Sequence, residues 1–111
     1  MKKKGSQGVE IARGTGDGMY ISFPDAPLEN GDEIRFAVRE DAESTEKLLE
    51  KTVTEFSGDG KAFIGFSEED TLSLEAGDYV YGVQVIRAGA EPVDVIREAS
   101  FTVKESVARN E

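Results

Sequence analysis

The sequence predicts a single all-β domain, and three observations support that prediction. Apolar and polar residues alternate in short segments rich in β-branched and aromatic residues, a period-two pattern typical of half-buried strands. Gly, Pro, Asn and Asp interrupt these segments about every ten residues, as turns do in β-sandwiches. The chain has 111 residues, the length of one domain, and 38% of them are hydrophobic, enough for one core.

Four strands are expected in the N-terminal half. Residues 9–13 and 19–23 are separated by a Gly-rich stretch, and the pattern allows either a hairpin or a switch between sheets. Proline ends the second segment because it donates no hydrogen bond to a ladder. Residues 32–40 alternate most clearly, after an Asn-Gly turn. The apolar spacing of residues 48–56 fits a helix or a strand, and we favour a strand because the segment is short and has β neighbours.

The C-terminal half begins with a strong turn signal at residues 57–60. We therefore expect residues 61–66 to pair with residues 48–56 as a hairpin. Ser67, followed by three acidic residues, predicts a helix start and one short helical turn near residues 67–74. The remaining strands share period-two alternation, and the first two are joined by a hairpin loop: residues 78–86, 93–96 and 99–103.

Seven or eight antiparallel strands of this kind predict an immunoglobulin-like β-sandwich. Tyr79 stands near the start of a late strand, where a tyrosine corner would direct its hydroxyl to the upstream backbone; a simple inward aromatic is the alternative. The domain is expected to span residues 9–107. Residues 1–8 and 108–111 are expected to be flexible ends.

The composition disfavours several classes of function. The chain has no Cys and no His, which excludes disulfides, thiolate metal sites and histidine-based catalysis. Its formal net charge is −10, so nucleic acid and anionic membranes are unfavourable partners. No apolar run follows the N-terminal lysines, and none is long enough to span a bilayer. We expect a soluble protein without a signal peptide, too small for a large active-site cavity.

No catalytic, cofactor-binding or metal-ligating residue is assigned. Calcium ligands are available in Glu68, Glu69 and Asp70, and separately in Asp17 and Asp25, but no spacing matches a known calcium loop. The acidic residues are more simply explained as solvated surface.

Two further patterns also lack the residues their chemistry needs. The Gly-rich segments 14–18 and 57–61 are not phosphate loops, because no Lys-Ser/Thr pair opens a helix after them. Glu50 and Glu55 would lie on opposite faces of a regular strand, so they cannot act together as a glycosidase pair. We expect no enzyme activity, and action through strand edges and loop ends rather than through a pocket.

Phe56 has a parity opposite to that of Leu49 and Val53. On the strand interpretation its ring faces solvent and could seed an interface, whereas a bulge at the strand end would turn it inward.

Several segments together resemble immunoglobulin-like domains of tailed phages of Gram-positive hosts, such as the N-terminal domain of the phage baseplate upper protein. The resemblance covers about residues 9–105 and is carried by these segments: residues 31–39, 49–53, 59–64, 67–71, 79–85 and 101–103. Gly82 and the insertion-like step Arg97-Glu98-Ala99 depart from the family pattern.

The resemblance implies a noncatalytic tail or baseplate module that works by assembly with another virion protein, with homo-oligomerisation open. Such a protein would be made in the bacterial cytoplasm and could be incorporated into the virion. A carbohydrate-binding or adhesion module at a bacterial surface is the alternative. The absence of Trp weakens that alternative, because sugar binding usually uses aromatic faces.

Overall fold

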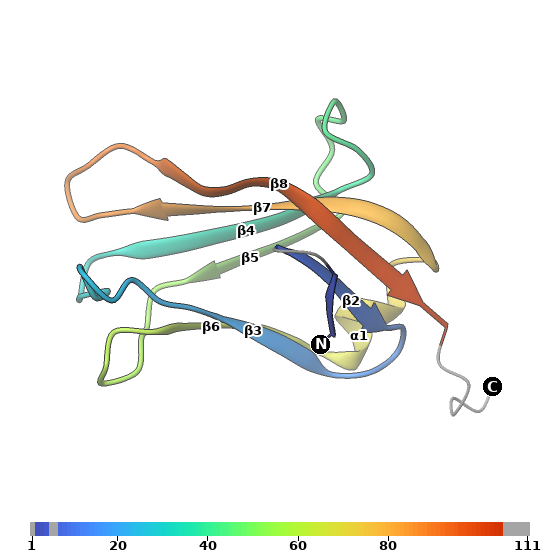
Figure 1. Cartoon of the computed structure of the whole chain (residues 1–111), viewed down its shortest axis with the longest axis horizontal. Coiled ribbons are helices and arrows are strands. Elements are labelled where there is room, and N and C mark those ends of the chain that lie inside the picture. The colour runs from blue at the N-terminus through green and yellow to red at the C-terminus, as the bar shows by residue number, and fades with distance from the viewer. Residues whose placement is uncertain (1, 5–6, 106–111) are drawn as a thin grey trace.

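The computed structural model describes residues 2–4 and 7–105, and this part of the chain is mostly β-structure with one short helix (Figure 1). Its elements are, in chain order, β1 Lys2–Lys4, β2 Gly8–Ala12, β3 Asp17–Ile21, β4 Glu33–Arg39, β5 Leu49–Val53, β6 Ala62–Phe66, α1 Glu68–Leu72, β7 Gly77–Ile86 and β8 Val93–Lys104. The prediction of an all-β fold with one helical turn near residues 67–74 is confirmed. β1 lies before the predicted domain start, and residues 108–111 lie outside the described part.

The described strands form a six-stranded sheet, in the order β1-β2-β8-β7-β4-β5, and a separate two-stranded sheet of β3 and β6. The β2–β8 pair is parallel, with Val9 opposite Phe101, whereas the other pairs are antiparallel. The expectation of antiparallel strands alone is therefore wrong. Period-two alternation reports the face of each side chain and carries no information about which strand becomes the neighbour.

The chain crosses between the two sheets in two places. The sequence pattern left the first crossing open, and it predicted a hairpin at the second. β2 and β3 belong to different sheets, so the Gly-rich stretch between them is a switch and not a hairpin turn. β6 pairs with β3 rather than with β5, and the predicted hairpin of residues 48–56 with 61–66 is wrong. The turn at Ser57 does form, because the Ser57 amide donates to the Lys61 carbonyl at 2.9 Å, but its flanking strands enter separate sheets.

The last two predicted segments form one long strand. β8 runs through residues 93–104 without a break and pairs with β7 around a bulge, where the register shifts between Tyr81 and Val83. Two residues of the insertion-like step, Arg97 and Glu98, lie in this bulge and face one residue of β7, whereas Ala99 is paired with Tyr81 at its edge.

Side chains from both sheets meet in one core. Phe36 of β4 lies at its centre, with ring centroids 5.1 Å from Phe66 of the small sheet, 5.6 Å from Tyr81 and 6.1 Å from Phe101. All four side chains are buried. Aromatic rings at these separations add attraction beyond their area burial, so this cluster holds the two sheets together.

Helix α1 is short but well capped. The Ser67 hydroxyl accepts from the Asp70 amide at 3.1 Å, and the Asp70 carboxylate accepts from the Ser67 amide at 2.8 Å, a reciprocal capping box. Lys51 of β5 also binds the Asp70 carboxylate, with an N–O distance of 2.7 Å. The predicted helix start at Ser67 is confirmed.

Candidate functional site

The acidic residues considered as calcium ligands do not gather into a cluster in the described part of the chain. In residues 2–4 and 7–105, no three His, Cys, Asp or Glu side chains gather closely enough to hold an ion. The Asp70 carboxylate takes part in the capping box and in the ion pair with Lys51. Glu68 and Glu69 are exposed beside it on the first turn of α1. Asp17 accepts a hydrogen bond from the Gly18 amide at 2.8 Å.

The carboxylates considered as a glycosidase pair are separated by the end of a strand. Glu50 lies on β5 and forms an exposed ion pair with Lys47 at 3.1 Å. Glu55 lies beyond Val53, where β5 ends, so the assumption that both stand on one strand is wrong. Phe56 lies in the same connection, and its side chain is partly buried against the core. Of the two orientations considered for this ring, the structure shows the inward one.

The outer face of the two-stranded sheet carries an exposed aromatic pair that is not among the residues predicted from the sequence. Tyr20 of β3 and Phe63 of β6 are register partners, their ring centroids are 4.9 Å apart, and they are 68% and 48% exposed. Each ring is next in sequence to a buried residue, Ile21 or Ile64. Because neighbouring side chains on a strand point to opposite faces, this alternation is the sequence signal that could have identified the exposed pair.

Glycine holds the Phe63 ring against this sheet. A Cβ built on Gly18 would lie 2.3 Å from the Phe63 Cζ atom and 2.8 Å from the Ile64 carbonyl oxygen, so only glycine fits beneath the ring. One on Gly65 would lie 3.0 Å from the same ring. The ring therefore covers the backbone of both strands and is fixed in place by it.

Polar side chains border the aromatic pair on one side. An open hollow beside Tyr20 is lined by Ser22, Ser57, Asp59 and Lys61. The Ser57 hydroxyl and the Lys61 ammonium both contact the Asp59 carboxylate, the latter at 3.3 Å. The Ser57 hydrogen bond and then the Lys61 contact keep the pKa of Asp59 below its usual range. This edge offers a carboxylate, an ammonium and hydroxyls next to an exposed ring.

A trough of about 460 Å³ lies on the opposite side of the molecule, over the outer face of β4, β5, β7 and β8. Its floor is the register pair Ala37 and Gly82, which alternate with buried residues on β4 and β7. The β4–β5 connection, which projects away from β3 and β6 (Figure 1), contributes Ala42 and Lys47 to one wall. Residues of the β8 bulge, including Arg97, contribute to the other.

The bulge accounts for the glycine in the floor. A Cβ on Gly82 would lie 3.2 Å from both the Ile96 and the Arg97 carbonyl oxygens, because β8 bends toward β7 at this point. Gly82 and the insertion-like step of β8 thus form a single local feature: extra residues in β8 face a glycine in β7.

The charges of the trough differ from those of the chain as a whole. Among the described lining residues, five are basic and three are acidic, whereas the whole chain has 13 basic and 23 acidic residues. Arg39 donates to the Ser44 carbonyl at 3.3 Å and forms no ion pair with a described residue. Arg97 is 90% exposed and lies 3.8 Å from its partner Asp94.

A buried carboxylate joins two connections at one end of the sheets. Asp32 is 6% exposed and accepts from the Glu29 amide at 2.9 Å, the Ala88 amide at 3.0 Å and the Arg87 guanidinium at 2.9 Å. The Glu29 and Ala88 amides, followed by Arg87, hold the pKa of Asp32 below its usual range. Arg87 also donates to the Ala26 carbonyl at 2.6 Å, so this network is structural.

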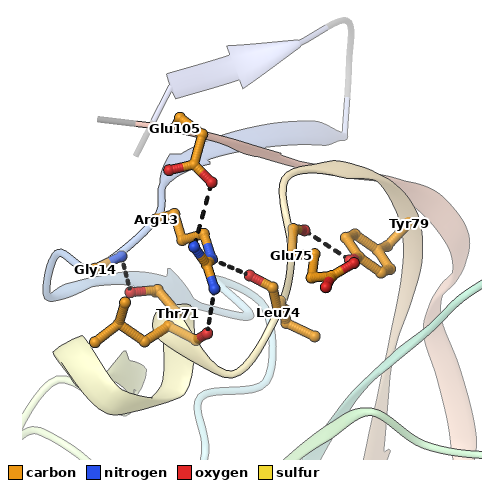
Figure 2. Close-up of polar contacts among 8 residues, drawn as sticks. Arg13, Gly14, Thr71, Leu74, Glu75, Tyr79 and Glu105 are labelled. Atoms are coloured by element: carbon orange, nitrogen blue, oxygen red, sulfur yellow. Dashed lines mark hydrogen bonds and ion pairs between the residues drawn. The ribbon is translucent and has the colours of Figure 1, made fainter. Parts of the chain in front are cut away.

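Arg13 joins the elements at the other end (Figure 2). Its guanidinium donates to the Leu74 carbonyl at 2.7 Å and to the Leu72 carbonyl at 3.1 Å, which caps the end of α1, and it pairs with Glu105 at 3.3 Å. Beside it, the Tyr79 hydroxyl donates to the Glu75 carbonyl at 2.7 Å (Figure 2). The predicted backbone contact of Tyr79 is confirmed.

No protein-family model and no curated protein matches this chain. Within the described residues, no helix is both long and apolar enough to cross a lipid bilayer. The described residues offer two outer faces as candidate interaction surfaces: the aromatic pair on the small sheet and the trough on the large one.

Proposed function

We propose that this chain is a noncatalytic, immunoglobulin-like interaction module of a phage or prophage tail or baseplate, made in the bacterial cytoplasm and assembled with another virion protein. The exposed Tyr20–Phe63 pair on a two-stranded sheet is the observation that carries the interaction role. The tail assignment comes from the sequence resemblance described above.

The strand order supports the immunoglobulin-like part of the proposal. In the series β8-β7-β4-β5 and the pair β3-β6, the strands follow each other as G-F-C-C′ and B-E do in variable-type domains. The Tyr79 contact to Glu75 corresponds to a tyrosine corner at the start of strand F. Phe36 occupies the strand-C position where antibody domains place a buried Trp, and aromatic packing stands in for the disulfide.

The aromatic face has the physical properties of a docking surface. Its two rings are large and exposed, and the Phe63 ring lies against glycine backbone, so ordering that ring on binding costs little entropy. In the described sheet, β3 and β6 pair only with each other, so each also presents an edge to which a partner strand could add. Aromatic anchors of this kind dominate the binding energy of many interfaces.

A photo-reactive phenylalanine derivative in place of Tyr20 tests the proposal. In tailed-phage particles produced from the source bacterium, we expect it to crosslink to a tail or baseplate protein, identified by mass spectrometry. The same derivative at the exposed residue Glu91, in the β7–β8 connection and part of neither the aromatic face nor the trough, is the matched control and should give no such crosslink. Absence of the chain from purified particles would overturn the tail assignment.

A carbohydrate-binding role is the second candidate, and the hollow beside Tyr20 favours it. Asp59 and Lys61 could hydrogen-bond sugar hydroxyls while a ring stacks on the exposed Tyr20 face. A glycan array followed by saturation-transfer NMR tests it. A bound sugar whose signal disappears in the Tyr20→Ser variant would favour adhesion. If no glycan binds, assembly stays the proposed function.

A further inference from the structure

We propose that the trough over β4, β5, β7 and β8 binds an extended acidic segment of another protein chain. The inference rests on the proposed role as a protein-interaction module. It concerns a different face from the aromatic pair and can fail independently of it.

The shape of the trough suits a main chain in extended conformation. Its lining runs along β4 from Arg35 to Arg39 and along β7 from Val80 to Gln84. Five residues per strand are separated by four rises and span about 14 Å, which matches a partner segment of about five extended residues. Because Ala37 and Gly82 place no long side chain on the floor, a partner backbone can approach the sheet closely.

The charges identify an acidic partner. Of the five basic lining residues, Lys51 directs its ammonium to Asp70 on the inner side of the sheet, which leaves four basic side chains for the trough in an acidic chain. Two of these four retain unused capacity. Arg39 has only a backbone carbonyl among its described partners, and Arg97 is held loosely at 3.8 Å from Asp94. A guanidinium binds a carboxylate in a bidentate geometry, so both arginines suit Asp or Glu side chains of a partner.

A short acidic peptide fits better than a nucleic acid. The formal net charge of −10 disfavours a long polyanion whose backbone extends beyond the trough. The trough is also lined by three carboxylates, those of Glu50, Asp94 and Glu98, which can accept hydrogen bonds from peptide N–H groups. A phosphate backbone has no such donors and cannot bind these carboxylates.

NMR titration of the full ¹⁵N-labelled chain with a decapeptide of alternating Glu and Ser tests the inference. We expect the amide signals of Ala37, Arg39 and Gly82 to shift, while those of Tyr20 and Phe63 stay in place. Affinity should fall about tenfold between about 20 mM and about 300 mM salt. A peptide with Gln in place of Glu should bind at least about tenfold more weakly.

Two variants locate the site, and one serves as a control. Arg39→Glu should weaken binding about tenfold through charge, and Ala37→Gln should weaken it by filling the floor without changing the charge. Lys61→Glu makes the same charge change next to the start of β6, away from the trough, and should leave binding intact. Thermal melts of all three establish that they fold.

Several outcomes would overturn the inference: no binding at millimolar peptide, shifts centred on β3 and β6, equal loss in the Lys61 variant, or tighter binding of an oligonucleotide of the same charge. Crosslinking at Tyr20 would be unaffected by such a result, so failure here is distinguishable from failure of the proposed function.

Discussion

Asp32 shows how one residue joins parts of the chain that are distant in sequence. Its carboxylate binds the backbone of its own turn at Glu29 and of the β7–β8 loop at Ala88, together with Arg87. The Arg87 guanidinium also lies 5.1 Å from the Phe23 ring centroid, which adds a cation–π contact. A negative charge is needed here because every partner is a donor.

Replacing Asp32 by Asn should lower the melting temperature at pH 7. The folded pKa lies below the ordinary value of 3.8, so the carboxylate stabilises the fold above that value, and the contribution is lost as pH falls through the folded pKa. The difference from wild type should therefore shrink below about pH 4. Calorimetry from neutral to acidic pH measures it. Asp25→Asn, at an exposed site nearby, is the control, and a gap that persists at low pH would contradict the assignment.

At the level of elements, α1 depends on its ends because five residues are too few for a helix to be stable alone. The capping box satisfies donors at its start, and Arg13 satisfies carbonyls at its end. Thr71 adds a contact inward, because its hydroxyl donates to the Thr15 carbonyl at 3.0 Å. The helix is thereby tied to the switch between β2 and β3.

Ser67→Ala should reduce the free energy of unfolding by about 1 kcal/mol, the usual cost of losing an N-cap. Urea denaturation measures the change. Ser67→Asp should restore most of the stability, because Asp caps equally well. If Ser67→Ala melts like wild type, the capping box contributes nothing to the stability of the domain.

At the scale of the whole molecule, the fold is two sheets of unequal size around an aromatic centre. The large sheet has six hydrogen-bonded strands, whereas the small sheet has only two described strands. A two-stranded sheet is only marginally stable unless it packs against other elements. Contacts such as Phe36 with Phe66 therefore connect the aromatic face to the rest of the domain.

Phe36→Ala should destabilise the domain by about 3–5 kcal/mol, the usual cost of such a cavity. Total stability of a domain is only about 5–15 kcal/mol, so Val83→Asp, which buries a charge in the same core, should unfold it. Circular dichroism with urea measures both. Arg35→Ala, on the exposed face of the same strand as Phe36, should cost little, and a Val83→Asp variant that melts normally would contradict the strand register.

The sequence by itself determined which side chains face inward along each strand, because alternation is local: Phe36 and Val83 were identifiable from their own segments. It also determined the helix start at Ser67 and the tyrosine contact, since both depend on residues three or four positions apart. Only the tertiary structure decided that β2 runs parallel to β8, that β6 pairs with β3, and that Ala37, Gly82 and the β8 bulge form one trough. Those pairings join residues far apart in the chain, and their free energy depends on packing between whole strands, which a local pattern does not contain.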